Sequence, residues 1–210
     1  MLFKICGLKE INIIDCCEKK NVDFFGMIFY DKSPRYITLK QAQELVNFSK
    51  NKNIKPVGVF VNENLEIVKS FIKNLDLKIV QLHGKENDEY IKEIKHNADL
   101  KVIKSIPIKD KKDFRKINNY QSNDYFLLDY KSEKDDLPGG NAKQFDWSLL
   151  SDLNINKPWF LSGGINKSNI NKIKNYVNPN GIDLSSGVEE VPGIKSVKMI
   201  NNLFEKYYVK

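Results

Sequence analysis

The sequence predicts an α/β fold, a single-domain (β/α)8 barrel of the TIM-barrel class that spans residues 1–210. Three observations support this prediction. Eight short β-rich segments alternate with segments of helical period along the whole chain. Several strand segments are apolar on consecutive residues, which is typical of parallel strands covered on both faces. No Pro/Ser-rich linker or low-complexity stretch divides the chain, so one domain is the simplest arrangement.

The eight predicted strands are, in chain order, LFKIC (2–6), DFFGMIF (23–29), KPVGVFV (55–61), LKIVQLH (77–83), LKVIKSI (100–106), DYFLLDY (124–130), KPWFLSG (157–163) and GIDLSSG (181–187). Eight strand-then-helix units with right-handed crossovers can close into a barrel. The alternative is an open doubly wound sheet. That fold favours GxGxxG after the first strand, and the sequence after Cys6 is GLKEIN, which lacks this motif.

Apolar residues recur at three- and four-residue spacing between the predicted strands. Four such stripes are Leu39-Ala42-Leu45-Val46, Leu65-Val68-Phe71-Ile72-Leu75, Ile170-Ile173-Val177 and Val197-Ile200-Leu203-Phe204-Tyr207. Each stripe could be a partner-binding surface, but packing against a sheet is the commoner reason for an apolar helix face. We therefore expect these segments to be helices that cover the barrel.

Composition restricts the kind of protein. The chain has 34 Lys and Arg against 27 Asp and Glu, a net charge of +7, but the lysines are scattered and do not indicate a nucleic-acid surface. Three cysteines, Cys6, Cys16 and Cys17, form no CxxC pair, so we expect reduced thiols in a cytoplasmic protein. We find no signal-peptide or membrane-span pattern. With only His83 and His96, we predict no metal, and we expect a monomer.

The loops after strands 7 and 8 favour a phosphate site. In this fold they commonly bind phosphate, because glycine lets backbone N–H groups approach the anion. Ser162-Gly163-Gly164 and Ser185-Ser186-Gly187 have this composition. Either turn alone could be an ordinary serine-capped turn. The occurrence of both at these two positions favours a phosphorylated small-molecule ligand.

Other chemically capable residues fall at strand ends, and each has an ordinary structural explanation when taken singly. Cys6 could be a small buried hydrophobe, Asp129 a cap, His83 a hydrogen-bonded core residue and Arg35 a solvated surface residue. A barrel, however, collects all of them at one mouth, where Cys6 on strand 1 and Asp129 on strand 6 face each other. The residues thus indicate a cofactor-free acid/base enzyme that acts on a phosphorylated small molecule.

The same segments carry a family resemblance. They are KICG (4–7), FYDKSPRY (29–36), VGVFVN (57–62), VQLHG (80–84), FLLD (126–129), GGNAKQFDW (139–147), SGGIN (162–166) and DLSSGVEEVPGIK (183–195). Together, and in this order, they resemble phosphoribosylanthranilate isomerases of tryptophan biosynthesis. The resemblance implies a cofactor-free and metal-free Amadori rearrangement of N-(5′-phosphoribosyl)anthranilate to 1-(2-carboxyphenylamino)-1-deoxyribulose 5-phosphate.

The resemblance also implies residue roles. Cys6 matches the general base and Asp129 the general acid, and Arg35 would pair with the anthranilate carboxylate. Other positions match substrate-binding residues: Gly163, Gly164, Ser185 and Ser186 at the phosphate, and His83 and Asp183 elsewhere at the mouth. A thiolate base requires a lowered pKa and an electropositive, partly exposed position, and both are expected of Cys6.

One loop departs from the family pattern. The family usually has GGTGKxFDW after strand 6, whereas this chain has Asn141 and Ala142 in place of the threonine and the following glycine. Alanine is restricted at positive φ, so we expect this departure to affect the closure of the loop and the turnover rate rather than the type of reaction. Two other functions stay open: another phosphosugar isomerase or epimerase of the same barrel class, and a non-catalytic basic binding module.

Overall fold

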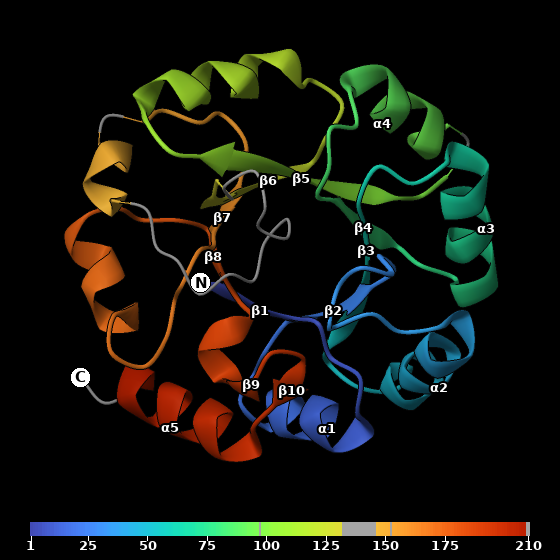
Figure 1. The fold of residues 1–210 in the computed structure, drawn as a ribbon, viewed down its shortest axis with the longest axis horizontal. Coiled ribbons are helices and arrows are strands. Elements are labelled where there is room, and N and C mark those ends of the chain that lie inside the picture. Colours follow the sequence, from blue (N-terminus) through green and yellow to red (C-terminus); the bar gives the residue numbers. More distant parts are fainter. Residues whose placement is uncertain (97, 132–145, 152, 209–210) are drawn as a thin grey trace.

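Eight parallel strands form a closed barrel in the computed structural model, which describes residues 1–96, 98–131, 146–151 and 153–208 (Figure 1). The strands are β1 (Leu2–Cys6), β2 (Phe24–Ile28), β3 (Lys55–Phe60), β4 (Ile79–Leu82), β5 (Lys101–Ile108), β6 (Tyr125–Tyr130), β7 (Trp159–Leu161) and β8 (Gly181–Leu184). They follow chain order around the ring, and β8 pairs with β1 to close it. This arrangement confirms the predicted fold class.

The strands separate two apolar cores because successive side chains point to opposite faces. Inside the barrel, Cys6 belongs to a small cluster that also contains Val57, Val59, Ile79, Ile103, Leu127 and Phe160. The opposite faces of the strands pack against the outer layer in a much larger core, which includes Phe3, Ile5, Val80 and Leu82. Both faces of the strands are therefore buried, as the continuous apolar runs predict.

Helices form the outer layer. The α-helices are α1 (Ile11–Lys19), α2 (Leu39–Ser49), α3 (Leu65–Leu75), α4 (Asp88–Lys95) and α5 (Val197–Tyr208). Shorter or tighter 3₁₀ helices are η1 (Lys111–Asn119), η2 (Trp147–Leu150), η3 (Ile170–Asn175) and η4 (Ser186–Val188). The stripes in α2, α3 and α5 are confirmed as helical. The Ile170 stripe forms the 3₁₀ helix η3, since Asn166 and Asn169 bond nearby backbone groups in place of a regular α-helical start.

The predicted strand limits need correction at several ends. Asp23 and Asp124 directly precede β2 and β6, and their side chains accept hydrogen bonds from the N–H groups of Phe3 and Val102 on neighbouring strands. At the other end, β7 and β8 stop at Leu161 and Leu184. The serine-glycine segments are consequently loops, free to form a binding surface.

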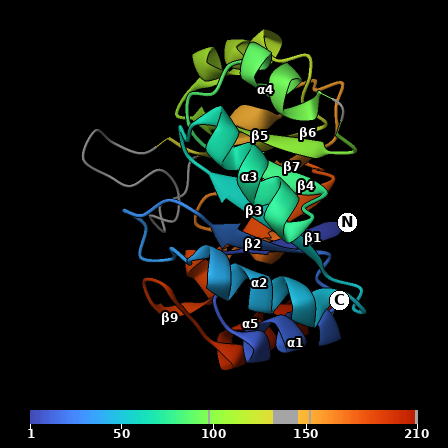
Figure 2. The same cartoon turned by 90° about the vertical axis from the view of Figure 1, so that its right-hand side faces the viewer.

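A short hairpin that the sequence does not predict interrupts the last unit. It consists of β9 (Glu189–Val191) and β10 (Ile194–Lys195) and lies at the same end of the barrel as the loop after β2 (Figure 2). Gly193 has φ +88°, and a Cβ on it would lie 2.4 Å from the Pro34 carbonyl oxygen. The hairpin thus packs directly on the loop that carries Arg35.

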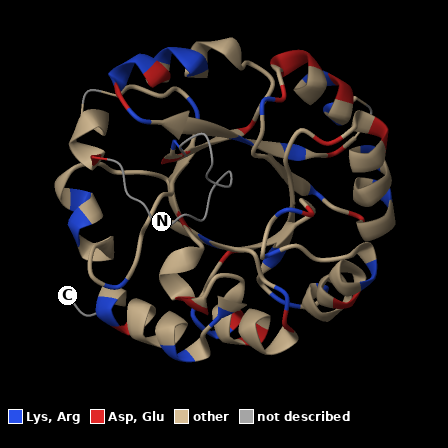
Figure 3. Cartoon of the chain, viewed as in Figure 1, with Lys and Arg blue, Asp and Glu red and all other residues tan. Residues whose placement is uncertain are grey.

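Charged residues lie on most of the outer helices, with Lys and Arg interleaved with Asp and Glu (Figure 3). The basic residues do not gather on a single face in this view, in agreement with the scattered lysines of the sequence. No helix in the described part of the chain has the length and apolar character needed to cross a membrane.

Candidate active site

A pocket of about 540 Å³, counted to its open mouth, lies at the carboxyl ends of the strands. It brings together six of the predicted site residues: Cys6, Arg35, His83, Asp129, Asp183 and Ser185. The other lining residues are Ile28, Tyr30, Ser33, Val59, Val61, Gln81 and Ser162. Gly163, Gly164 and Ser186 are not among the lining residues but adjoin Ser162 and Ser185 in the two loops.

Cys6 ends β1 opposite Gly26 of β2. A Cβ on Gly26 would lie 2.7 Å from the Cys6 sulfur, so this glycine makes room for the thiol. The next residue, Gly7, has φ +81°, and a Cβ there would lie 2.7 Å from Arg35 Cδ. Two glycines thus allow the thiol and the arginine to share one corner of the pocket.

A buried ion pair lies beside the thiol. Lys4, two residues before Cys6 on β1, is fully buried and its Nζ lies 3.0 Å from Asp183 Oδ1 of β8. Burial acts to lower the pKa of Lys4, but the Asp183 carboxylate outweighs it and the pKa is raised. A protonated ammonium therefore lies near Cys6, inside the barrel.

The surroundings of Cys6 differ from the expectation. The thiol is buried, with 6% of the residue exposed, and burial raises its pKa. The Lys4 and Lys195 ammonium groups act in the opposite direction, while Asp183 adds to the increase. The expected lowered pKa and partial exposure are therefore not found, because desolvation of the thiolate outweighs the two cations.

Asp129, at the end of β6, is held at both carboxylate oxygens. The Tyr130 N–H donates to Oδ1 at 2.8 Å, and His83 Nε2 lies 3.3 Å from Oδ2. On the other side of the ring, Gln81 Nε2 lies 2.9 Å from His83 Nδ1. Gln81, His83 and Asp129 form a hydrogen-bonded chain that reaches from β4 to β6 and fixes the orientation of the carboxyl group.

Arg35 is buried and bound by Glu189 of the hairpin. Arg35 Nε and Nη2 donate to the two Glu189 oxygens at 2.8 and 2.7 Å, and Lys195 also pairs with this carboxylate. Burial acts to raise the pKa of Glu189, but Arg35 and Lys195 outweigh it and lower the pKa. The β9–β10 hairpin thereby fixes the plane of the guanidinium at the pocket wall.

The two serine-glycine loops meet at one side of the pocket. Gly163 and Gly164 have φ values of +93° and +62°, and a Cβ on Gly187 would lie 1.9 Å from the Ile165 carbonyl oxygen. Only glycine permits this approach of the two backbones. Lys195 Nζ lies 3.5 Å from Ser185 Oγ, which places a buried cation beside the loops. This combination suits an anionic group.

Four further residues of the site, Lys4, Gln81, Glu189 and Lys195, are not among those predicted from the sequence. All four lie within the segments that carry the family resemblance, and the period-2 alternation of a strand already places Lys4 on the face of Cys6 and Gln81 on that of His83. Glu189 and Lys195 become recognisable only once the hairpin is known.

Asn141 and Ala142, which depart from the family pattern, lie outside the described residues. Within the described ranges, no group of three or more His, Cys, Asp or Glu side chains could hold a metal ion.

Comparison with known proteins gives a consistent result. The model of the N-(5'phosphoribosyl)anthranilate (PRA) isomerase family matches residues 3–206. A Rhizobium etli protein named N-(5'-phosphoribosyl)anthranilate isomerase is 40% identical over 204 residues, covering 96% of this chain and 91% of the relative. A protein of the same name from Parabacteroides distasonis is 34% identical over 209 residues, covering 98% and 93%.

Solved structures agree with the sequence relatives. Phosphoribosyl anthranilate isomerase from Thermotoga maritima superposes with a TM-score of 0.87 at 32% identity, over 98% of each chain. A further structure of a phosphoribosyl anthranilate isomerase, with a TM-score of 0.83, 31% identity and 98% coverage of both chains, is a complex with reduced 1-(o-carboxyphenylamino)-1-deoxyribulose 5-phosphate. On the extent of these matches, together with the barrel and its strand-end residues, the chain belongs to the N-(5'-phosphoribosyl)anthranilate isomerase family.

Proposed function

We propose that this protein converts N-(5′-phosphoribosyl)anthranilate into 1-(2-carboxyphenylamino)-1-deoxyribulose 5-phosphate in tryptophan biosynthesis, with Cys6 as general base and Asp129 as general acid. The observation that supports this most is the presence of both groups in one pocket, on strands from opposite sides of the barrel. The family membership supplies the identity of the substrate.

The reaction needs two proton transfers. Asp129 donates a proton to the oxygen of the sugar ring, which opens the ring and leaves a positively charged iminium. The iminium acidifies the proton on the neighbouring sugar carbon, and the Cys6 thiolate removes it. The resulting enolamine tautomerises to the ketone. General acid and base groups of this kind contribute about 10²- to 10⁴-fold each to a rate.

The residues around the two groups support their roles. Lys4 and Lys195 oppose the effect of burial on the Cys6 pKa, and their positive charges favour the thiolate form. His83 and the Tyr130 N–H orient the Asp129 carboxyl group. We assign the ester phosphate to the Gly163-Gly164 and Ser185-Ser186 loops. Arg35, oriented by Glu189, is assigned to the anthranilate carboxylate.

The test is turnover of enzymatically generated phosphoribosylanthranilate, followed by the loss of its fluorescence. We expect rapid loss with the unchanged protein, and rates lowered about 10²- to 10⁴-fold in Cys6→Ser and Asp129→Asn. Circular dichroism establishes that both variants are folded. An inactive unchanged protein would contradict the activity, whereas a fully active Cys6→Ser variant would contradict only the role of the thiol.

The single domain, the monomeric state and the cytoplasmic location stay predictions. One structural neighbour is described as a dimeric phosphoribosylanthranilate isomerase from Thermotoga maritima of which monomers were generated. Size-exclusion chromatography with light scattering at several protein concentrations tests the expected monomer: a mass of about 49 kDa, twice the 24.4 kDa of the chain, would contradict it.

A further inference from the structure

Gln81 lies on β4, two residues before His83, and its side chain points into the same pocket. The residue is almost completely buried, with 1% exposed. Its two amide atoms have different surroundings. Nε2 lies 2.9 Å from His83 Nδ1, whereas Oε1 is buried and has no hydrogen-bond partner among the described residues.

An unpartnered buried acceptor is costly, and native proteins contain few of them. Within the described ranges, one other buried side-chain atom lacks a partner, Trp147 Nε1. Trp147 does not line the pocket, whereas Gln81 does. The position of Gln81 at the wall of a substrate pocket indicates that a ligand supplies the missing donor.

The chemistry of the substrate limits what that donor can be. Phosphate and carboxylate groups in their ionised forms accept hydrogen bonds and do not donate them. The donors that phosphoribosylanthranilate does carry are its sugar hydroxyls and the anilino N–H. The anilino N–H belongs to the aromatic end, which we assign to Arg35. Gln81, by contrast, is linked through His83 to Asp129, the group assigned to the sugar ring oxygen.

We propose that Gln81 is a substrate-binding residue whose Oε1 accepts a hydrogen bond from a sugar hydroxyl of the bound phosphoribosyl compound. This inference rests on the proposed function. The same amide donates from Nε2 to His83 Nδ1, so the other ring nitrogen, Nε2, is the one that faces Asp129. A sugar hydroxyl at Oε1 therefore fixes the amide, and the amide in turn orients the histidine beside the acid.

The test is the affinity of Gln81→Met for reduced 1-(o-carboxyphenylamino)-1-deoxyribulose 5-phosphate, measured by calorimetry. Methionine keeps the approximate length of the side chain and removes the acceptor. We expect the dissociation constant to rise about three- to tenfold. We expect little net change in melting temperature, because the substitution removes the buried unpaired Oε1 together with the Nε2 bond to His83. An unchanged dissociation constant, or a weaker affinity with a clearly lowered melting temperature, would overturn the proposal.

Two controls separate the substrate contact from the effect on His83. In a His83→Ala background, Gln81→Met must still weaken the binding of the reduced product, that is, of reduced 1-(o-carboxyphenylamino)-1-deoxyribulose 5-phosphate. If the double variant bound this compound as tightly as His83→Ala alone, the proposal would be overturned. Inorganic phosphate should compete with the reduced product equally well in both proteins, since its loops follow β7 and β8. A parallel loss of phosphate affinity would indicate a deformed pocket and would also count against a specific contact. Failure of the proposed function itself is recognised separately, by inactivity of the unchanged protein.

Discussion

At the amino end of the barrel, polar side chains complete the backbone hydrogen bonding of neighbouring strands, whereas at the carboxyl end they point into a pocket. Asp23, Asp124 and Asn180, each just before a strand, accept from the N–H groups of Phe3, Val102 and Trp159 at 2.7, 2.8 and 3.0 Å. Among the described residues of the pocket wall only a weaker counterpart is seen, in which Ser185 Oγ donates to the Cys6 carbonyl oxygen at 3.2 Å, while Gln81, His83 and Asp129 bond to one another. The polar side chains at the amino end thus complete the backbone hydrogen bonds of the strands, and those at the carboxyl end line the pocket.

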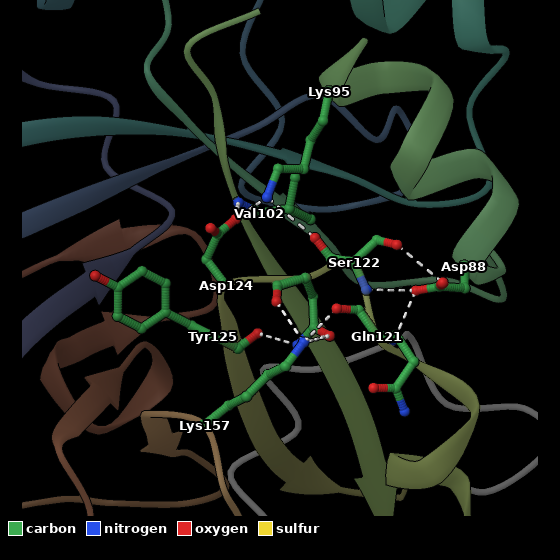
Figure 4. Close-up of polar contacts among 9 residues, drawn as sticks. Asp88, Lys95, Val102, Gln121, Ser122, Asp124, Tyr125 and Lys157 are labelled. Carbon is green, nitrogen blue, oxygen red and sulfur yellow. Dashed lines mark hydrogen bonds and ion pairs between the residues drawn. The ribbon is translucent and has the colours of Figure 1, made fainter.

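The amino end also uses lysines as structural cross-links (Figure 4). Lys157 Nζ donates to the carbonyl oxygens of Gln121 and Asn123, both at 2.7 Å, and Lys95 Nζ lies 2.8 Å from Asp124. Each ammonium has several oxygen partners. Lys4, in contrast, pairs with the Asp183 carboxylate and lies beside a thiol. A lysine is thus structural or chemical according to what its charge faces.

Lys4→Met gives the largest effect expected from this difference between the two ends. A general base must be deprotonated, so kcat/KM rises with pH until the thiol has ionised. Burial raises the pKa of Cys6 and Lys4 opposes it, so removing the ammonium moves this rise to higher pH. At a fixed pH on the rising limb we expect kcat/KM to fall about ten- to a hundredfold. The pH dependence of Cys6 alkylation by iodoacetamide, located by mass spectrometry, should move in the same direction.

The same variant changes stability in a pH-dependent way. Burial raises the pKa of Asp183 and Lys4 opposes it, so Lys4→Met raises that pKa further. A carboxyl group whose folded pKa exceeds its unfolded value contributes stability below the unfolded pKa and loses it as pH rises through the folded pKa. Lys4→Met should therefore lose stability as pH rises above about 4, the usual range of an aspartate. The double variant Lys4→Met/Asp183→Asn is the control, because it should no longer show this pH-dependent loss of stability. For the role of Lys4 beside the thiol, the contradicting result would be a Cys6 alkylation profile of Lys4→Met identical to that of the unchanged protein.

Asp124→Ala should produce the opposite result, a loss of stability without a loss of activity. The substitution leaves the buried Val102 N–H unpaired and removes the charged partner of Lys95, which keeps its bond to the Ser122 carbonyl oxygen. We expect unfolding by denaturant to show about 2 kcal/mol of lost stability, with kcat/KM unchanged. Asp124→Asn keeps the acceptor and should lose less. A drop in kcat/KM larger than the loss of folded protein would contradict the separation between the two ends.

Much of this architecture could be predicted from the sequence, because strand period and parallel topology are local properties with global consequences. Strand order and strand ends alone place Cys6, His83 and Asp129 at one mouth. The Lys4–Asp183 pair could not be predicted in this way, since its members are 179 residues apart and meet only when β8 closes on β1. The β9–β10 hairpin also depends on tertiary contact, namely the approach of Gly193 to Pro34.

Asn180→Ala is expected to have the smallest effect, and it tests how much charge contributes at the amino end. Asn180 Oδ1 accepts from the Trp159 N–H at 3.0 Å, as Asp124 does from Val102, but the acceptor is neutral and the site is exposed. Neutral hydrogen bonds are about half as strong as those to a charged group. We therefore expect about 1 kcal/mol of lost stability, or roughly 2–4 °C in melting temperature, with kcat/KM unchanged. A loss equal to that of Asp124→Ala would mean that the charge adds nothing at the amino end, and that the ion pair with Lys95 is dispensable.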